Sequence, residues 1–246
     1  MRLLHTLVIL SMAAWGAGCA APPAEHLPAY QWVDAPSALH DLCERSQRVH
    51  SLSAETSLTL TRSNGDTIHL DGAIAMRLPD SVRMRTWKFG QAVFDLTATP
   101  GGLWIEAPPD PERRGQVMPA SLSAAKMARA WAVISGEFFC AADARVVGVS
   151  PSLVGVERNI GGQRIVCEVQ RATLTPRKYS VFDADGVLRF TLTLDHYDLI
   201  GGIPWAVKLT AKSEGGLITI ELKDPELNGE LAPNAFVPPR KAEKMP

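Results

Sequence analysis

The sequence lacks most features that mark catalysis or charge-driven binding. The chain of 246 residues has a net charge of −1 and a pI near 6.6. This balance gives no electrostatic case for binding nucleic acid, which requires a basic face, or for steering to anionic membranes. The sequence also has no His-Glu-x-x-His, Cys-x-x-Cys, Gly-x-Ser-x-Gly or phosphate-binding glycine motif. We therefore predict no enzyme activity, no cofactor and no nucleic-acid partner.

Two clusters of titratable residues lack the partners that a metal site or a catalytic site requires. His40, Cys43 and His50 are spaced so that one helix could present them on one side, but a zinc site normally has four ligands and no fourth is evident. Residues 195–198 read Asp-His-Tyr-Asp, which ends a predicted strand and has no paired nucleophile. We interpret both as surface features and predict no metal site.

Cysteine is scarce, with four residues in the chain: Cys19, Cys43, Cys140 and Cys167. If Cys19 is lipidated, as argued next, the other three permit one disulfide in an oxidising compartment. Cys140–Cys167 is our hypothesis, although spacing alone does not determine connectivity.

The N-terminus has the form of a bacterial export signal. A basic start is followed by an apolar stretch and by Gly16-Ala17-Gly18-Cys19, which is too short to span a bilayer as a mature helix. The Gly-Cys junction resembles a lipobox, with Gly16 at a position where such boxes usually carry an aliphatic residue. That resemblance implies a signal peptide over residues 1–18 and a lipid anchor on Cys19. Ordinary signal cleavage, which would give a soluble secreted protein, is the alternative.

Period-two alternation of apolar and polar residues dominates the rest of the sequence. It is strongest over residues 55–107 and returns from residue 145 to about 222, and turn residues such as Asp-Gly and Gly-Gly separate the runs. Such alternation is typical of half-buried antiparallel strands joined by hairpins. We expect about 9–11 strands in a mainly antiparallel sheet, and a sheet of that size curls.

Two helices are predicted in addition to the strands. One spans about 36–52, with Asp34 as its N-cap, and the other spans about 121–136. The simplest closure is a curled half-open barrel whose concave face both helices cover. The domain would then comprise residues 34–232, preceded by a tether over 19–33 and followed by a proline-rich tail over 233–246 that we expect to be extended and partly loose.

This order of elements resembles the Lol-type lipoprotein carriers, a periplasmic chaperone and an outer-membrane receptor that share one fold. Three segments carry the resemblance: the helix that leads into the first set of strands over 38–61, the segment 82–101, and Met118-Pro119-Ala120-Ser121-Leu122. The resemblance implies a half-open barrel with a cavity for acyl chains. It is closest to the receptor branch, because of the anchored cysteine, and implies an exposed loop tip at Phe89, beside Trp87. A dry strand core containing both aromatic residues is the alternative.

The inward strand positions and the second helix supply the candidate cavity residues. They are Leu58, Leu60, Ile74, Met76, Met84, Phe94, Leu96, Met127, Trp131, Ile134, Phe190, Leu192 and Ile220. Apolar burial would drive binding of the acyl chains of lipids or lipoproteins, without covalent chemistry. Ala20 is not the Asp that favours inner-membrane retention in enteric bacteria, so we expect an outer-membrane protein that faces the periplasm. A periplasmic carrier protein is a further expected partner. The competing hypothesis is a lipid-anchored interaction protein whose core is filled.

Overall fold

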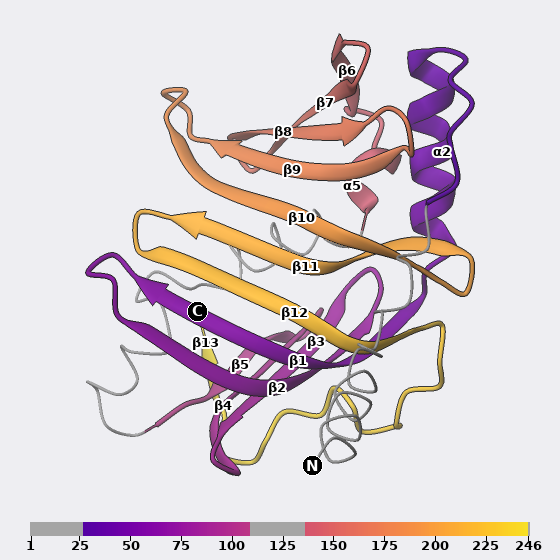
Figure 1. The fold of residues 1–246 in the computed structure, drawn as a ribbon. Helices are drawn as coiled ribbons and strands as arrows, with labels where there is room; N and C mark the ends of the chain where they lie inside the picture. Colours follow the sequence, from indigo (N-terminus) through magenta and orange to yellow (C-terminus); the bar gives the residue numbers. More distant parts are fainter. Residues whose placement is uncertain (1–26, 109–135, 246) are drawn as a thin grey trace, which may run out of the picture.

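The computed structural model describes residues 27–108 and 136–245, and within them one antiparallel sheet forms most of the fold (Figure 1). Thirteen strands run in the order β13-β5-β4-β3-β2-β1-β12-β11-β10-β9-β8-β7-β6. The strands are β1 (Ser51–Arg62), β2 (Thr67–Arg77), β3 (Ser81–Lys88), β4 (Gln91–Thr99), β5 (Gly102–Glu106), β6 (Arg145–Val149), β7 (Leu153–Ile160), β8 (Gln163–Gln170), β9 (Thr175–Phe182), β10 (Leu188–Ile200), β11 (Ile203–Ser213), β12 (Gly216–Leu227) and β13 (Glu243–Met245).

The predicted fold class is confirmed: the sheet is mainly antiparallel and curls without closing. Nearly every strand pairs with its neighbour in sequence through a hairpin, as short connections favour. The pairing of β1 with β12 joins the two sets of strands. The described residues hold more strands than the 9–11 expected, because the weakly patterned β6 and the short β13 also join the sheet.

Helix α2 (Ala35–Gln47) begins at the predicted cap, where Asp34 Oδ1 accepts a hydrogen bond of 2.8 Å from the backbone N–H of Ser37. It ends before the predicted boundary at 52, because Leu52 belongs to β1, where it is almost fully buried. Helix α5 (Glu137–Cys140) is short. The predicted helix over 121–136 falls, apart from Gly136, outside the described residues, as do the signal peptide and Cys19.

The disulfide hypothesis was wrong. Cys43 of α2 is bonded to Cys140 of α5, whereas Cys167 is a free, fully buried thiol on β8. Sequence spacing could not reveal this pair, because 97 residues separate its members and only the folded chain places α5 beside α2. Since Cys43 is consumed by the disulfide, the trio with His40 and His50 has no thiolate to offer a metal.

Helix α2 packs over one half of the sheet (Figure 1). Ala38 and Leu42 join Phe138, Phe139 and apolar residues of β7 to β10 in one buried cluster. A second cluster lies beneath β1 to β5 and contains Leu52, Met76 and Leu103. The helix therefore covers only part of the apolar face.

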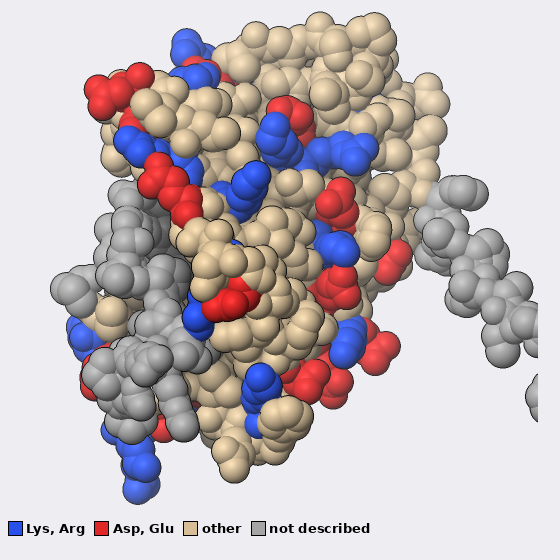
Figure 2. All heavy atoms as spheres, turned by 60° about the vertical axis from the view of Figure 1, so that its left-hand side comes forward, with Lys and Arg blue, Asp and Glu red and all other residues tan. Residues whose placement is uncertain are grey.

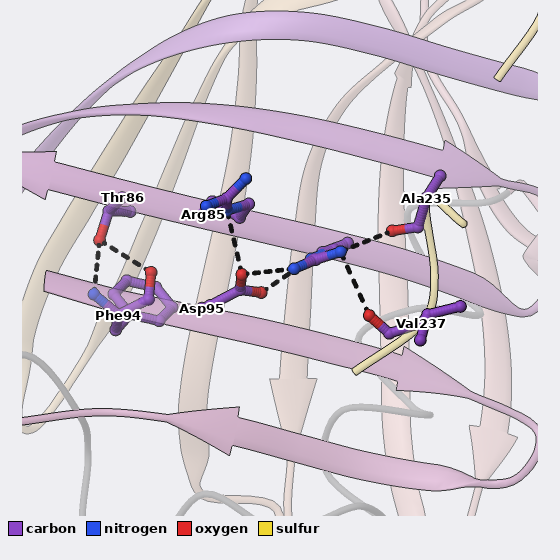
Figure 3. Close-up of polar contacts among 7 residues, drawn as sticks. Arg85, Thr86, Phe94, Asp95, Ala235 and Val237 are labelled. Carbon is purple, nitrogen blue, oxygen red and sulfur yellow. Dashed lines mark hydrogen bonds and ion pairs between the residues drawn. The ribbon is translucent and has the colours of Figure 1, made fainter. Parts of the chain in front are cut away.

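The C-terminal segment crosses the opposite face of the sheet and ends as β13 beside β5, far from its departure at β12 (Figure 1). Arg83 holds this segment: its Nη1 donates to the carbonyl oxygens of Ala235 and Val237 at 3.3 and 3.2 Å (Figure 3). The same guanidinium pairs with Asp95 through two hydrogen bonds of 2.9 and 2.7 Å. These contacts dock a segment that we expected to be partly loose.

Candidate functional site, an apolar concave face

Strand register aligns apolar residues of both predicted strand sets into rows across the sheet. One row, read from the pairing of successive strands, is Leu70, Leu58, Ile220, Leu209 and Leu194 on β2, β1, β12, β11 and β10. A second row joins Ile74, Met84, Leu96 and Ile105 on β2 to β5. Side chains that point to one face alternate with those that point away, so both rows lie on one face, where the buried Thr56 and Thr86 stand between them.

The predicted cavity residues within the described chain differ in burial. Four of them are buried, at 2–8% exposure: Met76, Leu58, Leu192 and Leu96. The other six are half-buried: Leu60, Ile74, Met84, Phe94, Phe190 and Ile220. Met127, Trp131 and Ile134 lie outside the described residues. The register thus brings residues from both strand sets to one face, some inside the core and some at its margin.

A cavity of about 100 Å³ lies between the C-terminal half of α2 and strands β9 to β11. Its lining within the described chain is Leu42, Arg45, Ser46, Val49, Gly136, Phe139, Pro176, Tyr179, Leu194, Tyr197, Ile203, Pro204, Trp205, Ala206 and Leu209. None of the predicted cavity residues is in this set, although Leu194 and Leu209 continue the apolar row through Ile220. Protein interiors rarely leave voids much larger than a water molecule, and one water needs only about 10–15 Å³ of such space.

The face of α2 that lines the cavity carries Leu42, Arg45 and Ser46, which are spaced at i, i+3 and i+4, and Val49 lines it just after the helix ends. Arg45 was not among the predicted site residues, and its place one helical turn after Leu42 was the sequence signal that could have indicated it. Partial burial lowers the pKa of Arg45, and Asp41 opposes that shift. Arg45 is the only charged residue among the described residues of the lining.

Two tyrosine hydroxyls flank the cavity in different ways. Tyr197 donates to the carbonyl oxygen of Pro176, and burial raises its pKa well above the ordinary value. Burial also raises the pKa of Tyr179. Both phenols are thus neutral near pH 7. In the described ranges no three His, Cys, Asp or Glu residues are grouped to hold a metal.

The predicted loop tip is a tight hairpin between β3 and β4. Lys88 pairs with Gln91, and the two residues between them, Phe89 and Gly90, have φ of 51° and 75°. Positive φ at both central positions defines a type I′ turn. Phe89 is 93% exposed and Lys88 Nζ lies 5.6 Å from its ring centroid, whereas Trp87 is half-buried within β3.

Charge on the surface is mixed. Figure 2 shows Lys and Arg side chains next to Asp and Glu side chains over the face in view, without a large area of one sign. None of the helices within residues 27–108 and 136–245 has the length and apolarity needed to cross a bilayer.

Comparison with solved structures shows which known proteins have a similar fold. The chain is similar to a LolA superfamily protein of Nitrosomonas europaea, with a TM-score of 0.58 and 14% identity over 84% of this chain and 98% of that one. The fold is LolA-like. No protein-family model and no curated protein matches the sequence, so the similarity is one of structure.

Two further structures agree with this assignment. A DUF1329 family protein of Desulfovibrio piger has a TM-score of 0.56 and 16% identity, over 83% of this chain and 98% of that one. An outer membrane lipoprotein-sorting protein domain of Vibrio parahaemolyticus has a TM-score of 0.55 and 15% identity, over 83% and 97%. At these identities the likeness establishes the LolA-type fold alone.

Proposed function

We propose that this protein is a lipid-anchored envelope protein that binds acyl chains of lipids or lipoproteins on the apolar face of its curled sheet. It acts by binding, without covalent chemistry. Cys19 is the anchor, the outer membrane is the location, and the domain faces the periplasm. Delivery of lipoproteins by a periplasmic carrier is the process in which such a protein would serve.

The apolar cavity beneath α2 is the observation that carries this proposal. Leu42, Phe139, Leu194 and Leu209 place hydrocarbon around it, and each buried methylene of a ligand contributes about 0.8 kcal/mol. A longer chain would extend from this cavity along the half-buried residues of the adjoining row, such as Ile220. The LolA-type fold, and the name of the Vibrio lipoprotein-sorting domain, support the same function.

The exposed Phe89 supports a membrane or partner contact away from the cavity. A bulky apolar side chain with positive φ is energetically unfavourable, and at 93% exposure Phe89 is not part of the core. Residues in such conformations concentrate at functional sites. We propose that the Trp87–Phe89 tip touches the membrane surface or the carrier during transfer.

Lipid content of the purified protein tests the proposal. The full chain carrying Cys19→Ala is exported, purified without detergent and studied by native mass spectrometry and by solvent extraction. We expect a co-purified acyl lipid, or saturable binding of a fluorescent fatty acid. A chain that yields no lipid and does not bind the fluorescent fatty acid contradicts acyl binding.

A second candidate is an envelope interaction protein with a filled core. The burial of Leu58, Met76, Leu96 and Leu192 favours it, because these side chains already pack within the protein. The same experiment separates the two functions, since a filled core gives neither extracted lipid nor fatty-acid binding.

A further inference from the structure

Arg45 occupies a position that apolar packing does not explain. It projects from the cavity-lining face of α2, one turn after Leu42, and is itself half-buried. Its Nη1 donates to the carbonyl oxygens of Thr173 and Leu174 at 3.3 and 2.7 Å. Those contacts dock the β8–β9 turn on the helix, but they use only part of the guanidinium.

The charge of Arg45 is not neutralised by these bonds. A guanidinium has five N–H donors, and carbonyl oxygens carry no net charge. Within the described part of the chain, no carboxylate lies within ion-pair distance of Arg45. Asp41, one helical turn away, accepts a hydrogen bond of 2.6 Å from the Tyr30 hydroxyl instead.

The surroundings of Arg45 favour an anion. The guanidinium fork forms two-point hydrogen bonds with carboxylate and phosphate oxygens. Such contacts strengthen in a partly dehydrated setting, where the effective dielectric constant is low. The other lining residues offer no competing charge, and the Tyr197 hydroxyl proton is already donated to Pro176.

We propose that Arg45 is the headgroup-binding residue of the cavity and pairs with the carboxylate or phosphate monoester of a single-chain amphiphile whose tail enters the apolar space. The inference rests on the proposed acyl binding and adds a preference for anionic ligands to it. The ligand class is thereby narrowed from any acyl chain to an anionic amphiphile.

The test compares three probes of equal chain length: dodecanoate, dodecyl phosphate and 1-dodecanol. Affinities are measured by calorimetry on the full Cys19→Ala chain. A charge-assisted hydrogen bond contributes about 1.5–3 kcal/mol, so we expect at least one anion to bind about 10-fold to 100-fold more tightly than the alcohol. Comparison of the two anions distinguishes a fatty-acid carboxylate from a phosphate headgroup.

The variant Arg45→Gln should bind all three probes with equal affinity, close to that of wild type for the alcohol. Arg48→Gln is the matched control, because Arg48 is the C-cap residue of the same helix, is exposed and does not line the cavity. In this variant the preference for anions should persist. If Arg45→Gln does not fold, Arg45→Lys replaces it and should bind both anions more weakly than wild type while retaining their preference over the alcohol.

The outcomes test acyl binding and the role of Arg45 separately. Wild-type protein that binds none of the three probes contradicts acyl binding itself. Wild-type protein that binds the alcohol as tightly as both anions leaves acyl binding intact and overturns the role of Arg45. An anion preference that survives Arg45→Gln, or undiminished anion affinity in Arg45→Lys, overturns that role as well.

Discussion

The sulfurs of Cys43 and Cys140 are bonded, so α2 is fixed to α5 across 97 residues of sequence. Phe138 and Phe139, which immediately precede Cys140, are buried in the same cluster as Leu42. The disulfide therefore holds the helix beside this aromatic pair, of which Phe139 lines the apolar cavity.

Removal of this bond should lower stability. In the chain-entropy account, a crosslink that closes about 100 residues contributes about 4–5 kcal/mol to the free energy of unfolding. We expect the double variant Cys43→Ala/Cys140→Ala to unfold at a clearly lower urea concentration than wild type and to be insensitive to dithiothreitol.

Cys167→Ala is the control for that experiment. Cys167 is a free thiol, so this variant should keep the sensitivity of wild type to dithiothreitol, apart from a smaller loss due to its own cavity. Loss of the dithiothreitol effect in Cys167→Ala would instead indicate that Cys167 forms the disulfide.

The sheet was predictable from sequence because its signals are local. The alternation of Leu58 and Leu60 with polar neighbours gives the inward face of β1, and an Asp-Gly turn over residues 183–186 follows β9. Asp34 likewise marked the start of α2. Each of these features is set by residues within a few positions of one another, which propensity and patterning describe.

Contacts between residues far apart in the sequence could not be predicted from local patterns. The disulfide and the docking of the C-terminal segment on Arg83 join residues 97 and more than 150 positions apart. The lining of the cavity beneath α2 was not predictable for a similar reason: Leu209 and Leu194 come to line the same space as Val49 only after β10 and β11 pack beneath α2. Which apolar residues fill the core and which border a cavity depends on that packing.

Asp95 should be essential for retaining the C-terminal segment (Figure 3). Its carboxylate binds Arg83 and also accepts Arg85 Nε at 3.0 Å, and both Arg83 and Asp95 are largely buried. Breaking a buried ion pair by removing one charge costs about 3–5 kcal/mol. We expect Asp95→Asn to lower the melting temperature and to accelerate amide exchange in residues 235–245, as measured by mass spectrometry. Unchanged exchange there would show that Arg83 holds the segment without Asp95.

The lowered pKa of Glu157 predicts that the free energy of unfolding decreases in acid. The hydrogen bond from Arg145 at 2.6 Å, together with Arg164, lowers the pKa of Glu157 below its usual value of about 4.3. A carboxyl group with a lowered folded-state pKa stabilises the protein above the unfolded-state pKa, and this contribution disappears as pH falls through the folded-state value. Glu157→Gln should therefore be less stable than wild type at pH 7 and show a smaller decrease below about pH 4.3, measured by urea unfolding. Glu168→Gln, at the half-exposed pair with Lys178, controls for loss of a surface carboxylate, which costs little.

Phe89 should lower the stability of the protein and contribute to its binding to membranes. A type I′ turn favours Asn before Gly, and left-handed backbone costs an ordinary side chain about 1–2 kcal/mol. We expect Phe89→Asn to raise the unfolding midpoint while reducing co-sedimentation of the Cys19→Ala chain with phospholipid vesicles. Val187→Asn, at an exposed apolar residue of the β9–β10 hairpin, should not change co-sedimentation. Equal sedimentation of Phe89→Asn and wild type would exclude the tip from membrane contact.

Filling the cavity should weaken ligand binding without lowering the stability of the protein. Ala206 lines the cavity and is 8% exposed, so Ala206→Leu directs three added carbons toward a space of about 100 Å³. Burying extra methylenes in an existing void is favourable by about 0.8 kcal/mol each, provided that no neighbour is displaced. We expect unchanged or higher thermal stability together with at least a tenfold loss of dodecanoate affinity. The matched variant Ala73→Leu lies on β2, outside this cavity, and should leave dodecanoate affinity unaltered. If Ala206→Leu binds dodecanoate as wild type does, the acyl chain occupies another part of the apolar face, and the row through Leu58 and Ile220 becomes the next region to test.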